Sequence, residues 1–108
     1  MGLFDLFAGP DINVGVQEWK ASKGAVLLDV RSADEHGQGH IPGSVNVPLN
    51  RINQVLELYP DKGTQLFEYC LSGARSNQAV SFLKRSGYGS VKNIGGISGY
   101  TGKVVRWL

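Results

Sequence analysis

The segment LFEYCLSGARSNQAVSFLKRSG, residues 66–87, contains three structural signals in succession. Residues 65–70 form a short apolar run, which is typical of a strand that is buried on both faces. The next residues are mostly small, and a wide apolar stripe of a helix follows, formed by Ala79, Val80, Phe82 and Leu83. Gly87 would end this helix. A buried strand that leads through a tight loop into a helix indicates an α/β fold.

The remainder of the chain alternates in the same way. A further strand is predicted at residues 25–30, which form a continuous apolar run rich in β-branched side chains. Two short strands are predicted at residues 44–49, where Pro48 ends the strand, and at residues 91–94, where Gly95 and Gly96 end it. Strands that are separated by helices imply a parallel sheet with helices on both faces. We therefore expect a single α/β domain over residues 1–108.

Three further helices are expected. Ile52, Val55, Leu56 and Tyr59 recur at helical spacing, with Asn50 as the predicted N-cap and Pro60 as the end. A shorter helix over residues 16–22 should bury Trp19. A last helix over residues 100–108 should dock Val104, Val105 and Leu108.

Composition excludes several classes of function. The chain has 108 residues and a formal charge of +2 with scattered basic residues, so no nucleic-acid-binding surface is indicated. No apolar run reaches transmembrane length, and the N-terminus lacks the basic region of a signal peptide. These observations predict a cytoplasmic protein with neither nucleic acid nor membrane as a partner.

The chain has one cysteine, Cys70, which excludes an internal disulfide and dithiol chemistry. It follows a strand, at the edge of the sheet where open α/β folds bind ligands. Gly73 can adopt a positive φ, so that loop N–H groups converge on one point, and the helix dipole adds positive potential there. Arg75 supplies a cation, and this setting lowers the pKa of a thiol. The alternative is an inert, buried cysteine.

Three segments together resemble the single-domain rhodaneses, a sulfurtransferase family: LLDVRSADEHGQGHIPGSVNVP (27–48), YCLSGARS (69–76) and NIGGISGY (93–100). The resemblance spans about residues 12–102, which it marks as the core of the domain. It implies a five-stranded parallel sheet with helices on both faces. It implies that Cys70 attacks a sulfane sulfur, carries it as a persulfide and transfers it to an acceptor. The loop that would bind the substrate comprises Leu71, Ser72, Gly73, Ala74, Arg75 and Ser76.

The expected substrates are thiosulfate or a persulfide or polysulfide as the donor, and a thiol or cyanide as the acceptor. A sulfur-relay protein is a further candidate partner, and no cofactor is expected. Many single-domain relatives carry Arg directly after the cysteine, where this chain has Leu71. That difference indicates weaker binding of thiosulfate and use of a less charged donor.

Two other functions remain open. Cysteine-based phosphatases and arsenate-type reductases of similar fold place five residues between the cysteine and the arginine, whereas four stand between Cys70 and Arg75. The smaller ring suits a single sulfur atom. A non-catalytic sulfur-carrier or binding module is the other alternative, although relatives of that kind usually lack the cysteine.

Two pairs of polar residues outside the loop are also candidates. Asp29 and Arg31 follow the first strand, and the resemblance implies that they support the active-site end through hydrogen bonds; the alternative is an ordinary polar pair at a strand end. His36 and His40 have a spacing that metal sites use on helices. Glycines between them disrupt a helix and no third ligand is evident, so we predict no metal site.

Overall fold

The structure is a computed structural model that describes residues 9–107. At its centre lies a sheet of four strands in the order β2-β1-β3-β4, and every neighbouring pair is parallel. The strands are β1 (Val26–Asp29), β2 (Val45–Asn46), β3 (Leu66–Cys70) and β4 (Val91–Gly96). The α/β class is confirmed. The expected five strands are wrong for the described residues, which form four.

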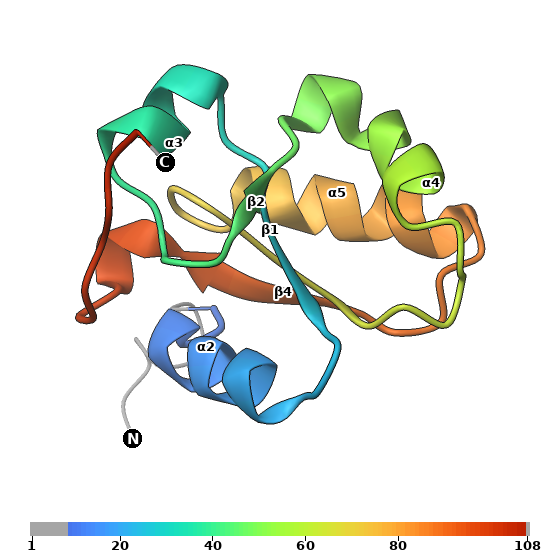
Figure 1. The fold of residues 1–108 in the computed structure, drawn as a ribbon, viewed down its shortest axis with the longest axis horizontal. Helices are drawn as coiled ribbons and strands as arrows, with labels where there is room; N and C mark the ends of the chain where they lie inside the picture. Colours follow the sequence, from blue (N-terminus) through green and yellow to red (C-terminus); the bar gives the residue numbers. More distant parts are fainter. Residues whose placement is uncertain (1–8, 108) are drawn as a thin grey trace.

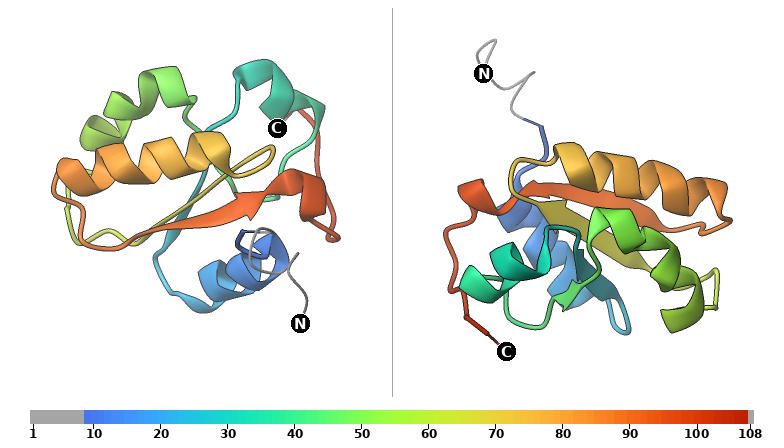
Figure 2. Two further views of the ribbon diagram at one scale, coloured as in Figure 1. Left: turned by 180° about the vertical axis from the view of Figure 1, so that it is seen from behind. Right: turned by 90° about the horizontal axis from the view of Figure 1, so that it is seen from above.

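Helices cover both faces of this sheet, as predicted (Figure 1). Figure 2 shows α2 on one face, with α4 and α5 on the other. The helical elements are α2 (Ile12–Ala21), α3 (Ala33–Gln38), the 3-10 helix η1 (Leu49–Gln54), α4 (Val55–Leu58), α5 (Ala74–Arg85) and the 3-10 turn η2 (Ile97–Gly99). Within the described residues, none of these helices has the length and apolar character needed to cross a membrane.

The central strand β3 divides the core into two clusters. Successive side chains of a strand point to opposite faces. Leu66 and Cys70 accordingly join the cluster beneath α5, and Phe67 and Tyr69 join the cluster beneath α2. All five residues of β3 are buried. Cys70 therefore lies at the end of the best-covered strand, on the face that α5 packs against.

Two helix starts differ from the sequence prediction. The helix α2 begins at Ile12 rather than near residue 16, because the Asp11 carboxylate accepts a hydrogen bond from the Asn13 N–H at 2.9 Å and caps it. The helical segment before Pro60 begins directly after Pro48 without a side-chain cap, so the predicted Asn50 cap is wrong. Proline there needs no N–H partner and its φ already suits a helix start.

The predicted helix at residues 100–108 is wrong. This segment instead runs past the end of α3, where Val105 and His40 exchange two backbone hydrogen bonds of 2.9 Å. The Trp107 N–H donates to the Gly37 carbonyl oxygen at 3.0 Å. In a helix these backbone groups would bond within the segment itself. Here they bond instead to the backbone of Gly37 and His40. Val105 is half-buried, and Leu108 lies outside the described residues.

The two tryptophans pack at edges of the fold. Trp19 is half-buried rather than buried, and its indole N–H donates to the Ala25 carbonyl oxygen at 3.1 Å. The Trp107 ring lies against Gly37 so closely that a side chain at that position would collide with it. Trp19 therefore lies over the turn before β1 and Trp107 lies against α3, and neither fills the centre of the core.

One buried carboxyl group has no partner. Glu68 lies in β3 and is fully buried, and neither of its carboxyl oxygens has a hydrogen-bond partner within the described residues. Burial raises the pKa of Glu68 to about 9, although the backbone of Lys92 and the charge of Lys84 oppose the shift. The folded protein therefore holds this group in its neutral form at pH 7.

Glu68→Gln should make the stability of the fold less dependent on pH. The pKa of Glu68 rises from 4.5 to about 9 on folding. The contribution of this group to the stability of the folded state is therefore complete below pH 4.5 and is lost as the pH rises toward 9. The free energy of unfolding falls by at most about 1.4 kcal/mol per pH unit through this group. Denaturant unfolding at pH 5, 7 and 9 should show the wild type declining more steeply than the variant. Parallel pH profiles would contradict the assignment.

Candidate active site

The thiol of Cys70 lies beneath a short loop that joins β3 to α5. Gly73, the residue before the first turn of α5, has φ 102°, as the sequence predicted, and α5 begins at Ala74. In this conformation the Gly73 N–H donates to Cys70 Sγ at 2.9 Å. Cys70 is only 1% exposed, so its sulfur is recessed below the surface.

Hydrogen bonds to the Cys70 sulfur lower the pKa of the thiol by more than burial raises it. Burial alone would raise the pKa of the Cys70 thiol. The Ser76 hydroxyl and the backbone N–H groups of Ser76, Gly73 and Ser72 act in the opposite direction, and the net effect lowers the pKa below its ordinary value. The N-terminus of α5 points its dipole at the same place. The loop is therefore suited to a thiolate, which is the direction expected from the sequence.

Asn93 of β4 ties the loop to the sheet, a role that the sequence analysis missed. Its side-chain N–H donates to the Gly73 carbonyl oxygen at 3.1 Å, and its Oδ1 accepts from the Ser76 hydroxyl at 2.7 Å. The Ser76 Oγ also lies 3.1 Å from the Gly73 carbonyl oxygen and 3.5 Å from Cys70 Sγ, so three acceptors compete for its single proton. The available signal was an amide side chain directly before the buried end of the strand VKNI.

The glycines that follow Asn93 allow β4 to pass close to the loop. A side chain at Gly96 would collide with the carbonyl oxygen of Leu71, and Gly95 has φ 107°. The Ser98 N–H donates to the same Leu71 oxygen at 3.2 Å. The sequence analysis treated these two glycines only as the end of a strand. Because Gly96 has no side chain, the loop that follows Cys70 can lie directly against β4.

Arg75 is paired with a carboxylate that the sequence analysis did not identify. Its Nη1 and Nη2 donate to the two carboxylate oxygens of Glu35 at 2.7 and 2.9 Å. Glu35 also forms a capping box with Ser32 at the start of α3. The hydrogen bond from Arg75 is the main reason that the pKa of Glu35 falls to about 2. Arg75 therefore joins α3 to the loop, and its charge is already balanced.

The buried Asp29 carboxylate organises the end of β1. It forms an ion pair with Arg31, in which Nη2 lies 2.7 Å from Oδ2, and it receives the Arg31 backbone N–H at 2.9 Å. The Tyr69 hydroxyl donates to it at 3.1 Å, and His36 Nδ1 lies 2.8 Å away. Arg31 also donates to the Gly39 carbonyl oxygen. These bonds connect β1, α3 and β3, and a supporting role of Asp29 and Arg31 for the active site stays a prediction.

The two histidines are engaged in this same region. Their rings are stacked with centroids 3.7 Å apart. His36 Nδ1 faces Asp29, and His40 Nδ1 lies 2.7 Å from the His36 carbonyl oxygen. Among residues 9–107, no three His, Cys, Asp or Glu side chains gather as a metal site would require.

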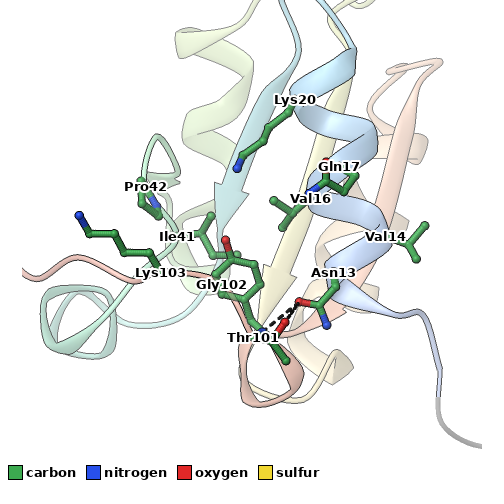
Figure 3. Close-up of a pocket in the computed structure, with 11 residues that line it drawn as sticks. Asn13, Val14, Val16, Gln17, Lys20, Ile41, Pro42, Thr101, Gly102 and Lys103 are labelled. Carbon is green, nitrogen blue, oxygen red and sulfur yellow. Dashed lines mark hydrogen bonds between the residues drawn. The ribbon is translucent and has the colours of Figure 1, made fainter.

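Two surface pockets differ in their relation to Cys70. The larger one, about 630 Å³, lies between α2 and residues 100–103, where two hydrogen bonds join Thr101 to Asn13 (Figure 3). It is lined by Lys20 and Lys103 but by no residue of the Cys70 loop. A second pocket of about 510 Å³ lies against Arg75. Of these two pockets, only the second is lined by a residue of the loop that follows Cys70.

Ser76→Ala should raise the pKa of Cys70, because it removes the hydroxyl that contributes most to lowering it. The rate of alkylation by iodoacetamide as a function of pH would give the midpoint. Ser81→Ala is the matched control, since Ser81 is an exposed residue of the same helix whose hydroxyl bonds only to the Asn77 carbonyl oxygen. Equal midpoints for both variants would show that Ser76 does not act on the sulfur.

The rhodanese-like domain family matches residues 15–103 of this chain. The thiosulfate sulfurtransferase PspE of Escherichia coli (strain K12) is 35% identical over 71 residues, which cover 65% of this chain and 68% of that protein. The thiosulfate:glutathione sulfurtransferase of Homo sapiens is 30% identical over 101 residues, which cover 82% and 83%.

A solved structure described as a rhodanese with anions from E. coli superimposes with a TM-score of 0.71. It is 31% identical and covers 77% of this chain and 99% of its own. Other curated relatives are longer, and the chain spans 24% of the length of one of them and 42% of another.

Proposed function

Because this chain belongs to the rhodanese-like domain family, we propose that it is a sulfurtransferase that carries a sulfane sulfur as a persulfide on Cys70. One observation supports this most strongly. The sulfur of the chain's only cysteine accepts the Gly73 N–H at 2.9 Å, at the start of α5, in a setting that lowers its pKa. A thiolate is the form that attacks sulfur.

The proposed reaction has two steps. The Cys70 thiolate attacks the outer sulfur of the donor, the donor's S–S bond breaks, and its electron pair leaves with sulfite or with a thiolate. The acceptor, as a thiolate or cyanide, then attacks the outer sulfur of the Cys70 persulfide. The Sγ–S bond breaks and its electron pair returns to Cys70, so the cycle needs no oxidant and no reductant.

The surroundings of Cys70 suit these steps. A recessed sulfur admits the narrow end of a thiosulfate or persulfide more readily than a bulky phosphoryl group. Loop N–H groups lie where the outer sulfur would carry its negative charge. The chain offers no second thiol that could displace the outer sulfur and form an internal disulfide.

The proposal also covers the sulfur donor, the acceptor, a partner protein and the location. Thiosulfate, a persulfide or a polysulfide is the proposed donor, and a thiol or cyanide the proposed acceptor. Two relatives are named for thiosulfate, and one of them for glutathione. A sulfur-relay protein remains a candidate partner and the cytoplasm the proposed location.

Cys70→Ser should abolish sulfur transfer and leave the fold intact, because a hydroxyl is not ionised at neutral pH and forms no persulfide. Intact mass after incubation with thiosulfate or polysulfide should show one added sulfur atom in the wild type and none in the variant. Thermal unfolding of both proteins is the control for folding. A wild type that gains no sulfur, or a serine variant that turns over thiosulfate and cyanide, would refute the proposal.

Leu71→Arg should improve the use of thiosulfate more than that of a monoanionic persulfide. Leu71 is 48% exposed beside the nucleophile, so a cation there would face solvent and an approaching dianion. Water and salt screen such a charge, and we expect a gain of roughly several-fold in kcat/KM that shrinks as the salt concentration rises. Equal losses for both donors would instead mean that position 71 supports the shape of the loop.

A further inference from the structure

A groove with one basic end opens beside the Cys70 loop. Its volume is about 510 Å³, and we name it the Arg51 groove. Its lining comprises Val30, Ser32, Ala33, Pro48, Leu49, Asn50, Arg51 and Arg75. It thus joins the segments that follow β1 and β2 to the first turn of α5, as the arrangement of α3, η1 and α5 in Figure 1 illustrates.

This location is where an α/β fold places a ligand. The strand order β2-β1-β3-β4 means that the chain leaves β1 toward one side and β3 toward the other. Ligands bind at the carboxyl ends of strands where such a divergence occurs. Val30 packs in the same core cluster as Cys70, and Arg75 belongs to the Cys70 loop. The groove therefore reaches the loop that follows Cys70 at Arg75.

The chemistry of the groove differs between its wall and its end. Val30, Ala33, Pro48 and Leu49 form an apolar wall, which suits a carbon skeleton better than a bare inorganic anion. Of the two arginines, Arg75 is balanced by Glu35. Arg51 is exposed and forms no ion pair with any residue from 9 to 107. The groove therefore has one uncompensated cation, which lies at its η1 side.

The backbone holds Arg51 in this place. Arg51 interrupts η1 with φ −125° and ψ 21°, and its N–H donates to the Pro48 carbonyl oxygen at 2.8 Å. The neighbouring Leu49 N–H donates to the Val30 carbonyl oxygen at 3.0 Å, and Ile52 is buried in the core. The kink is thus anchored to the end of β1 on one side and to the core on the other.

We propose that the Arg51 groove binds the carbon skeleton of an organic thiol that bears a carboxylate, and that Arg51 recognises the carboxylate. This inference rests on the proposed sulfurtransferase function and assigns the residue that selects the acceptor. A guanidinium binds a carboxylate through two parallel hydrogen bonds, whereas a neutral hydroxyl offers no such pairing. The apolar wall would direct the thiol sulfur toward Cys70.

The step at this site is balanced without a further reactant. The thiolate of the acceptor attacks the outer sulfur of the Cys70 persulfide and forms a new S–S bond. The Sγ–S bond breaks, its electron pair leaves with Cys70 as the thiolate, and the transferred outer sulfur keeps its negative charge. The products are an organic persulfide and free Cys70.

A single-turnover experiment isolates this step. The full chain is first loaded with sulfur from polysulfide, its persulfide is verified by intact mass, and excess donor is removed. Discharge is then followed by mass with 3-mercaptopropionate or with 3-mercaptopropan-1-ol, which have the same carbon skeleton and differ in charge. In Arg51→Gln, the ratio of the two rate constants should fall roughly five- to tenfold relative to the wild type.

Two further variants make the result specific. Arg85→Gln removes the same charge from an exposed position at the far end of α5 and should leave the ratio at its wild-type value. Ala33→Leu narrows the groove without disfavouring α3, and it should slow both thiols relative to cyanide, which has no carbon skeleton to accommodate.

The outcomes separate this inference from the proposed function. An unchanged ratio in Arg51→Gln, or an equal slowing of both thiols, would overturn the assignment of Arg51. The same drop in Arg85→Gln would show only a general effect of net charge, and that also overturns it. A wild type that never acquires sulfur would instead refute the sulfurtransferase proposal itself. Efficient discharge only by a protein thiol would replace the small acceptor with a macromolecular one.

Discussion

The hydrogen bond from the Gly73 N–H to Cys70 Sγ depends on the left-handed backbone of residue 73. Only that turn lets the chain leave β3, reverse and start α5 with its N–H groups aimed at the sulfur. A side chain at this position would strain the backbone. A Cβ there would make only an ordinary contact of 3.6 Å with Gly95 of β4, so the constraint lies in the backbone angle. The hydrogen bond that favours the Cys70 thiolate therefore depends on a positive φ at residue 73, which glycine adopts without strain.

That turn is held from two sides by residues far apart in the sequence. Asn93 binds the Gly73 carbonyl oxygen from β4, and Glu35 binds Arg75 from α3. Because the loop itself contains mostly small side chains, it has little apolar surface with which to fix its own shape. Polar contacts from the neighbouring elements supply that rigidity, and they place the nucleophile relative to the grooves around it.

Asp29 and Glu68 are buried carboxyl groups on adjacent strands, and the cost of removing each from water is offset in a different way. Asp29 of β1 is surrounded by donors from Arg31, Tyr69 and His36, which compensate for its removal from water. Neither carboxyl oxygen of Glu68 in β3 has a hydrogen-bond partner among residues 9–107, and the group remains neutral instead. The first arrangement connects three elements of the fold. The second leaves β3 with a group whose ionisation opposes folding.

Local patterns explain which parts of the fold could be predicted. The strand at residues 65–70, the positive φ of Gly73 and the start of α5 follow from residues that are adjacent in sequence. The pairing of Arg75 with Glu35 and of Ser76 with Asn93 depends on contacts across 40 and 17 residues, which no local pattern encodes. The extended segment at residues 100–107 follows from pairing with His40, which overrides its helical pattern.

The pairing of Arg75 also changes how the site must attract anions. An arginine at the end of the loop was expected to supply a free positive charge, but Glu35 neutralises it and fixes its side chain in place. The attraction beside the sulfur then comes from backbone N–H groups, which are short-ranged and favour a small charged atom. Recognition of a larger organic partner requires a separate cation, and within the lining of the adjacent groove Arg51 meets that requirement. Chemistry at the sulfur and selection of the acceptor are thus assigned to different residues, so that one can change without disturbing the other.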